Sequence, residues 1–243
     1  IEKILLRKEF VGLKFQELSL DSEPQLNENE HILDYLLRVN KKGLHDKVIK
    51  NHIIYCVLID IVYFLYEALE ASLQKRLTVS IALLRKPFVF DLVLLLRLFF
   101  TTDFLDRFNS EEFFDSTSLS KEDLQELIRI SSEVLVTNSI DPDLIYDSIY
   151  NQSNSDSLIN LSNKALHPST TRNKMNLTGI QNINFIFSTE KEIMIQWDYL
   201  YGQLPFLLIY LVEVIDFIVF SQLELGDNIY NERIKERIAI YPK

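Results

Sequence analysis

Five charged residues lie within segments of the chain that are otherwise apolar, and they are the first candidates for chemistry. Arg85, Asp91 and Arg97 belong to one such segment, and Glu213 and Asp216 belong to another. An ionised side chain is costly to remove from water unless it is paired or its pKa shifts. These residues therefore predict either a buried structural network of ion pairs or a functional polar pocket.

The spacing within each group restricts how its members can meet. Glu213 and Asp216 are three residues apart, so a helix places their carboxylates side by side, and their repulsion predicts a nearby cation or a shared proton. The three charges of the first segment are six residues apart, which places successive members about 120° apart around a helix. They cannot all face one pocket unless Pro87 reorients part of that helix.

A histidine immediately before a proline is the most distinctive short feature of the sequence. Because proline disfavours the helical conformation of its predecessor, His167 must leave its helix before Pro168. A histidine in that position can be presented into a cleft at the helix end, where the nearby Arg172 and Lys174 would suit an anion. The alternative is a helix stop with a histidine that faces solvent.

The combination of Arg85-x5-Asp91 with the later run Leu161-Ser-x4-His-Pro-Ser169 resembles uncharacterised bacterial helical proteins near the HEPN-like superfamily. HEPN domains are helical and often dimeric, and they include metal-independent ribonucleases of toxin–antitoxin and phage-defence systems. The resemblance implies a similar setting here, with RNA or a nucleotide as the ligand.

The HEPN catalytic signature, Arg-x4–6-His, is not intact at His167, because Asn160, Leu161 and Ser162 occupy the positions where its arginine would stand. A formal match occurs only at Arg38 and His45, with Gly43 between them. This departure puts a ribonuclease activity in doubt.

Two hypotheses of function follow. In the first, a HEPN-like protein binds or acts on RNA or a nucleotide, with His167, Arg85 and Asp91 as catalytic residues in a shared pocket. The roles are anion binding, orientation and acid–base or phosphate contact. The remaining charged candidates would bind the ligand: Arg97, Arg172, Lys174, Glu213 and Asp216. In the second, a non-catalytic interaction protein buries a structural polar network and presents a surface for a homodimer or another partner.

Composition excludes several other classes of protein. The net charge of −10 disfavours a broad non-specific nucleic-acid surface but leaves room for a local basic groove. The one cysteine, Cys56, excludes an internal disulfide framework and a cysteine-based zinc site. Glu-x-x-His pairs and phosphate-binding loops are not present as a set, so we expect neither a metal nor a cofactor. Charges interrupt the apolar stretches 53–66, 88–100 and 204–220, so we expect buried core helices, no membrane span and a cytoplasmic protein.

The low glycine content, 5 residues, and the apolar periodicity predict an all-α helical bundle that forms a single domain over 1–243, with 1–43 as a peripheral helical arm. Long central helices are expected, with Pro87 kinking or splitting the second and with Gly202 and Pro205 interrupting the third. One short β segment is expected near 182–187. The expected helices are 2–18, 30–41, 45–73, 75–107, 120–135, 141–150, 157–166, 189–225 and 227–240.

Overall fold

The computed structural model describes residues 25–135, 140–172, 174, 177–181, 183–184, 189–223, 231–233 and 235. Within those residues the regular elements are all helical, so the predicted all-α class is confirmed. The predicted helix 2–18 lies outside the described residues, as does most of the predicted helix 227–240. Of the predicted β segment, residues 183 and 184 are described, and they are not in a strand.

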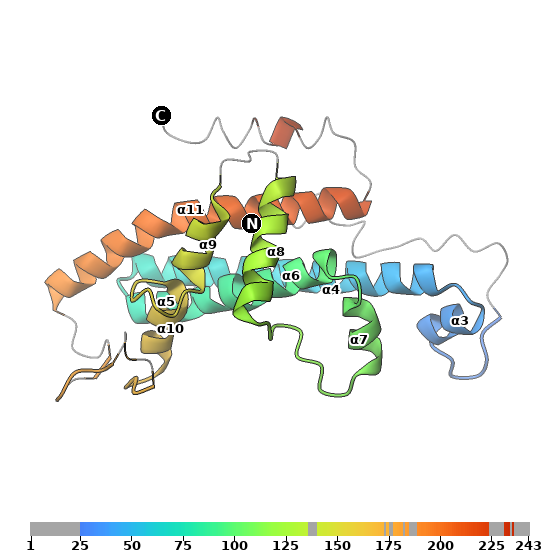
Figure 1. Ribbon diagram of the computed structural model, residues 1–243, viewed down its shortest axis with the longest axis horizontal. Helices are drawn as coiled ribbons and strands as arrows, with labels where there is room; N and C mark the ends of the chain where they lie inside the picture. Colours follow the sequence, from blue (N-terminus) through green and yellow to red (C-terminus); the bar gives the residue numbers. More distant parts are fainter. Residues whose placement is uncertain are drawn as a thin grey trace.

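Two long helices set the length of the molecule. Helix α4 (Lys42–Leu73) and helix α11 (Glu190–Leu223) both follow its long axis (Figure 1). After α4 the chain reverses at Lys75, which has a φ of 59°, and helix α5 (Leu77–Arg85) packs back against α4. The apolar faces of these helices meet in the core, where Ile54, Leu84 and Leu211 are almost completely buried.

The helix after α4 changes its geometry at Pro87, where the sequence predicts a kink or split. Residues Lys86–Asp91 form a π-helix, η1, which continues into helix α6 (Leu92–Phe100). Proline removes one backbone donor, and a π turn accommodates one extra residue in the helix. The predicted helix 75–107 is too long, because the chain leaves the helix at Thr101 and starts the separate helix α7 (Phe104–Ser110).

The shorter helices begin where the capping residues predict. Ser120 Oγ accepts a hydrogen bond from the backbone N–H of Asp123 at 3.1 Å, which starts helix α8 (Lys121–Val134). Asp141 accepts one from the N–H of Asp143 at 2.9 Å, which starts α9 (Pro142–Ile149). Helices α3 (Ile32–Arg38) and α10 (Leu158–Leu166) complete the set, and Figure 1 shows α8 and α9 crossing the long helices.

The predicted interruption of the last long helix is wrong. Helix α11 passes through both Gly202 and Pro205 without a break. Proline costs one backbone hydrogen bond inside a helix, but Leu204 and Leu207 on either side of it are buried in the core. Their packing outweighs the local preference. Further along, Tyr210 is completely buried, and its hydroxyl lies 2.6 Å from Ser131 Oγ of α8.

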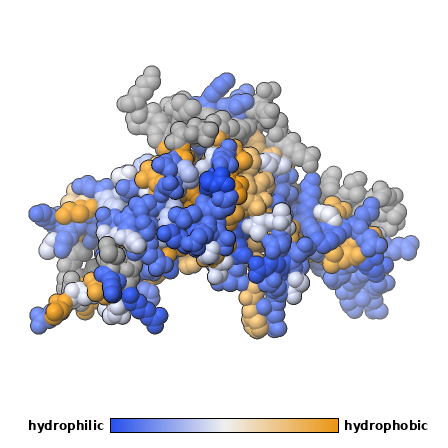
Figure 2. Space-filling view, viewed as in Figure 1, coloured by the Kyte–Doolittle hydropathy of each residue, from blue (hydrophilic) through white to orange (hydrophobic). Residues whose placement is uncertain are grey.

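Apolar surface is distributed unequally over the two long helices. By length and composition alone, both α4 and α11 could cross a membrane. In the most apolar 18-residue stretch of each helix, however, 56% is buried inside the protein in α11 and 28% in α4. On the face drawn in Figure 2, hydrophilic residues predominate, and apolar residues gather mainly in the middle, over α11 and its neighbours. The protein therefore uses α11 as a core helix and leaves more of α4 exposed.

Candidate functional site

His167 ends helix α10 in the way the sequence predicts. Its backbone is extended, with φ −115° and ψ 130°, and its N–H still donates to the carbonyl of Asn163 at 3.0 Å. The side chain is exposed. The chain then turns back on itself, because Asn184 Nδ2 donates to the carbonyl oxygen of His167 at 3.0 Å and the N–H of Thr178 donates to that of Thr170 at 3.0 Å. These bonds connect Asn184 to the end of α10 and Thr178 to Thr170.

A pocket of about 530 Å³ lies at this helix end, and we call it the His167 pocket. Seven described residues line it, and all of them have polar side chains: Asn160, Asn163, His167, Ser169, Thr170, Thr171 and Arg172. Two of the seven, His167 and Arg172, can contribute positive charge. The pocket therefore offers hydroxyl and amide groups beside a cation, which is the chemistry that binds phosphate or another anion.

Arg85 supports this pocket from the neighbouring helix. Helix α10 packs against α5, and the guanidinium Nη1 of Arg85 donates a hydrogen bond to Oδ1 of Asn163. The guanidinium carbon also lies 5.3 Å from the ring centroid of Phe90, and burial lowers the pKa of Arg85. Arginine stays charged in proteins, so Arg85 orients the amide of Asn163 and adds positive potential behind the pocket. The structure thus places His167 and Arg172 in the lining of one cavity, and Arg85 one hydrogen bond away from it, through Asn163.

Asp91 belongs to a different cluster. Its Oδ1 accepts a hydrogen bond from Lys86 Nζ at 2.7 Å, and the same ammonium lies 2.5 Å from Asp60 Oδ2 of α4. Burial raises the pKa of Asp91 to about 6 against the opposing effect of Lys86. Its other oxygen, Oδ2, is buried and has no hydrogen-bond partner among the described residues. Asp91 is not one of the residues that line the His167 pocket, so the pocket that was expected to hold Arg85, Asp91 and His167 contains no contribution from Asp91.

Arg97 fixes a loop. Its Nη1 donates to the backbone carbonyl of Asp115 at 2.7 Å, and its guanidinium carbon lies 5.1 Å from the ring centroid of Phe114. The side chain is buried, and its pKa is lowered chiefly by burial. Arg97 therefore holds the chain between α7 and α8, away from the His167 pocket.

The carboxylates on α11 are buried, as their apolar neighbours predict. Glu213 and Asp216 are 6% and 4% exposed. Arg233, from the short helical stretch 231–233, approaches Asp216 Oδ1 with its Nη1 at 4.0 Å and lies over the ring of Phe220. The sequence predicts a cation beside this pair, and Arg233 is that cation. The exposed Lys174 is not among the residues that line the His167 pocket.

The two residues of the formal HEPN-type match, Arg38 and His45, contact different carboxylates. Arg38 donates from Nε to Glu30 Oε1 at 2.7 Å, and His45 Nδ1 lies 2.8 Å from Asp46 Oδ1. Arg38 is held at the surface by Glu30, while His45 is buried. Each side chain thus has its own local carboxylate partner.

A second pocket, which the sequence does not predict, lies beside the π-helix, and we call it the Tyr146 pocket. Its volume is about 440 Å³. Three aromatic side chains line it, namely Phe90, Tyr146 and Tyr150, from two segments that are far apart in sequence. The one sequence feature that indicates this region is Pro87, which predicts altered helix geometry there.

Metal chemistry has no obvious centre in the described part of the chain, where His, Cys, Asp and Glu form no group of three or more placed to hold an ion. Comparisons with family models, with curated proteins and with solved structures find no match to this chain.

Proposed function

We propose that this protein binds a phosphate-bearing ligand, RNA or a nucleotide, in the His167 pocket. The observation that supports the proposal is that all seven described residues lining that pocket carry polar side chains, Arg172 and His167 among them, in a chain of net charge −10. A local cationic cavity on an acidic protein concentrates anions at one place. The HEPN-like resemblance adds the expected setting, a bacterial cytoplasmic protein acting in stress or phage defence.

Each charged group of the pocket has a distinct role in this proposal. Arg172 contacts the phosphate, for which its planar guanidinium is well suited. Arg85 acts as a positioning residue, because its hydrogen bond to Asn163 sets the direction of that amide. His167 lies at the mouth, where an imidazole can contact the phosphate or transfer a proton to or from a ribose hydroxyl.

Binding is tested with a fluorescent single-stranded oligoribonucleotide, AMP and inorganic phosphate, titrated against the full chain. Arg172→Ala should weaken the binding of the phosphate-bearing probes about tenfold, as expected for the loss of one charge-assisted contact. Arg76→Ala is the matched control, because Arg76 is an exposed arginine at the start of α5, outside the residues of the pocket. Binding of RNA but not AMP would identify RNA as the ligand. Equal affinity of the wild type and Arg172→Ala for every probe would contradict the proposal.

Catalysis is tested separately, by RNA cleavage with the wild type, His167→Ala and Arg85→Ala. Loss of cleavage in both variants would assign a ribonuclease activity to the pocket. No cleavage by the wild type, or equal cleavage by all three proteins, would leave a binding protein without enzymatic activity.

A second candidate function is self-association through α4. One side of this helix exposes large apolar residues at helical spacing, with Tyr63, Tyr66 and Leu73 at 58%, 47% and 63% exposure. The opposite side, with Ile54 and Ile61, is buried in the core. Exposed apolar surface of this kind is typical of a protein interface, and a second copy of the chain would cover it.

Sedimentation velocity tests this second candidate. A dimer of the wild type that becomes a monomer in Tyr63→Glu, but not in the control Leu144→Glu on α9, would support self-association through α4. A wild type that stays monomeric at all concentrations would contradict it. Flotation of the wild type with lipid vesicles would instead show that this face of α4 meets a membrane.

A further inference from the structure

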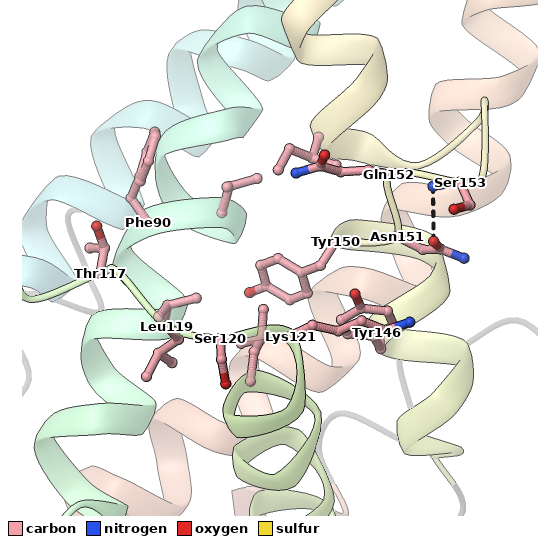
Figure 3. A pocket seen from close by; sticks show the side chains of 14 residues that line it. Phe90, Thr117, Leu119, Ser120, Lys121, Tyr146, Tyr150, Asn151, Gln152 and Ser153 are labelled. Atoms are coloured by element: carbon pink, nitrogen blue, oxygen red, sulfur yellow. Dashed lines mark hydrogen bonds between the residues drawn. The ribbon is translucent and has the colours of Figure 1, made fainter. Parts of the chain in front are cut away.

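The Tyr146 pocket is built where several parts of the chain meet. The π-helix contributes Phe90, the loop after α7 contributes Thr117, the start of α8 contributes Lys121 and the end of α9 contributes Tyr146 and Tyr150. Figure 3 shows the ring of Tyr150 in the middle of this lining, with Thr117 and Leu119 on one side and Tyr146 and Asn151 on the other. The cavity, of about 440 Å³, lies within the range of small-molecule sites.

Hydrogen bonds hold the walls of this pocket in place. Tyr150 donates its hydroxyl to the backbone carbonyl of Phe88 in the π-helix at 2.6 Å, so this tyrosine locks the end of α9 to η1. On the opposite side, Asn151 Oδ1 accepts from the N–H of Ser153 at 2.9 Å, the bond drawn in Figure 3. Asn160 Nδ2 donates to the carbonyl of Gln152 at 2.9 Å. The pocket is therefore formed before any ligand enters.

Its surface is divided between ring faces and polar edges. The rings of Tyr146 and Tyr150 lie 6.3 Å apart, centroid to centroid, and Phe90 adds a third ring to the lining. Amide and hydroxyl groups of Asn151, Gln152 and Ser120 lie around the same cavity. Aromatic walls suit a flat ring. Ser120 Oγ is already bonded to Asp123, and the Asn151 amide donates to Asp147 and accepts from Ser153. The edge of such a ring therefore meets the second hydrogen and the second lone pair of Asn151 and the amide of Gln152.

The charges near this pocket disfavour an anion. Lys121 is the one cation in the lining, and its Nζ lies 5.8 Å from the ring centroid of Tyr146. Burial raises the pKa of Tyr146, and the negative charges of Glu122 and Asp147 raise it further. Glu122 and Asp147 thus place negative charge near Tyr146, so that an uncharged ligand meets less repulsion there than a phosphate would.

We infer that the Tyr146 pocket binds an uncharged planar heteroaromatic ring of the nucleobase class, stacked against Tyr146 and hydrogen-bonded at its edge by Asn151 and Gln152. This site is separate from the His167 pocket. The inference does not depend on phosphate binding there.

The test uses adenosine, which carries the ring but no phosphate, with ribose as the probe that lacks the ring. Isothermal titration of the full chain should show saturable binding of adenosine and none of ribose. Tyr146→Ala should weaken adenosine binding about tenfold, because one stacking face is lost, while Tyr146→Phe should stay within about twofold. Phe113→Ala is the control, since this exposed aromatic residue follows α7 and lies outside the pocket.

A second variant guards against a folding defect in Tyr146→Ala. Leu124→Trp keeps the α9 residues intact and fills the cavity from α8, so it should also abolish adenosine binding. No saturable binding of adenosine by the wild type would overturn the inference. Undiminished binding by both Tyr146→Ala and Leu124→Trp would overturn it as well. Because adenosine has no phosphate, these outcomes are independent of the titrations with Arg172→Ala.

Discussion

The His167 pocket and the Tyr146 pocket both use residues of α10, yet they are made in different ways. The described residues that line the first come from the continuous stretch 160–172, and their side chains are polar. The second collects residues from η1, α6, α8, α9, α10 and the loops between them, and aromatic and aliphatic side chains form much of it. A local stretch of chain thus makes the cationic cavity, and tertiary packing makes the aromatic one.

The two pockets are also joined physically. Arg85 hydrogen-bonds to Asn163 of the first pocket and lies over Phe90 of the second. Asn160 lines the first pocket and donates to the carbonyl of Gln152, which lines the second. One scaffold, α5 with η1 and α10, thus supports both the proposed anion site and the proposed ring site.

The largest effect is expected at Asp91, which lies in the shared π-helix but lines neither pocket. Because burial raises its pKa from 3.8 to about 6, this group favours folding most below pH 4, and its contribution is lost as the pH rises through 6. In Asp91→Asn, the change in the free energy of unfolding between pH 4 and pH 7 should therefore be altered by up to about 3 kcal/mol. Urea unfolding at both pH values measures it. Asp34→Asn, at an exposed site on α3, is the control, and identical pH profiles for Asp91→Asn and the wild type would exclude the effect.

The next effect concerns the wall that holds the Tyr146 pocket open. Tyr150→Phe removes the hydroxyl that donates to the carbonyl of Phe88 while it keeps the ring. We expect a loss of about 1–2 kcal/mol in the free energy of unfolding, because a buried acceptor loses a partner. Thermal and urea denaturation measure this loss. Tyr66→Phe, at a half-exposed position, should leave the free energy of unfolding unchanged. An equal loss of stability in both variants would show that the hydrogen bond to η1 has no special role.

A third experiment separates the two pockets by their ligands. Arg172→Ala should weaken phosphate binding about tenfold and leave adenosine binding unchanged, whereas Tyr146→Ala should do the reverse. The separation is expected because Arg172 lines only the first pocket and Tyr146 only the second. Titration of both ligands against both variants measures it. If each variant weakened the binding of phosphate and of adenosine equally, the two cavities would act as a single site.

The smallest effect is expected from salt. Raising the salt concentration from about 50 to about 200 mM should weaken RNA binding about three- to sevenfold if one or two phosphates are neutralised in the His167 pocket. Adenosine binding should hardly change, because the ring carries no charge. Fluorescence anisotropy for RNA and calorimetry for adenosine measure how each affinity depends on the salt concentration. A strong salt dependence for adenosine would show that charge contributes to the Tyr146 pocket after all.

The helices and their ends follow from the sequence because they depend on neighbours in the chain. Ser120 and Asp141 cap their helices, and His167 leaves its helix before Pro168, as local rules predict. The same rules fail at Pro205, where burial of Leu204 and Leu207 keeps α11 continuous. Local preference is decisive only where tertiary packing does not oppose it.

By itself the sequence determines an all-α protein, the charged residues that are buried, and the histidine at the end of α10. Only the tertiary structure decides the partners: Arg85 with Asn163, Asp91 with Lys86 and Asp60, and Asp216 with Arg233. It also decides that the aromatic rings of α9 face the π-helix. The physical reason is that the burial of a charge or a ring can be inferred from its neighbours in the chain. The group that offsets the cost of a buried charge, or that packs against a buried ring, comes from a distant segment that folding brings close.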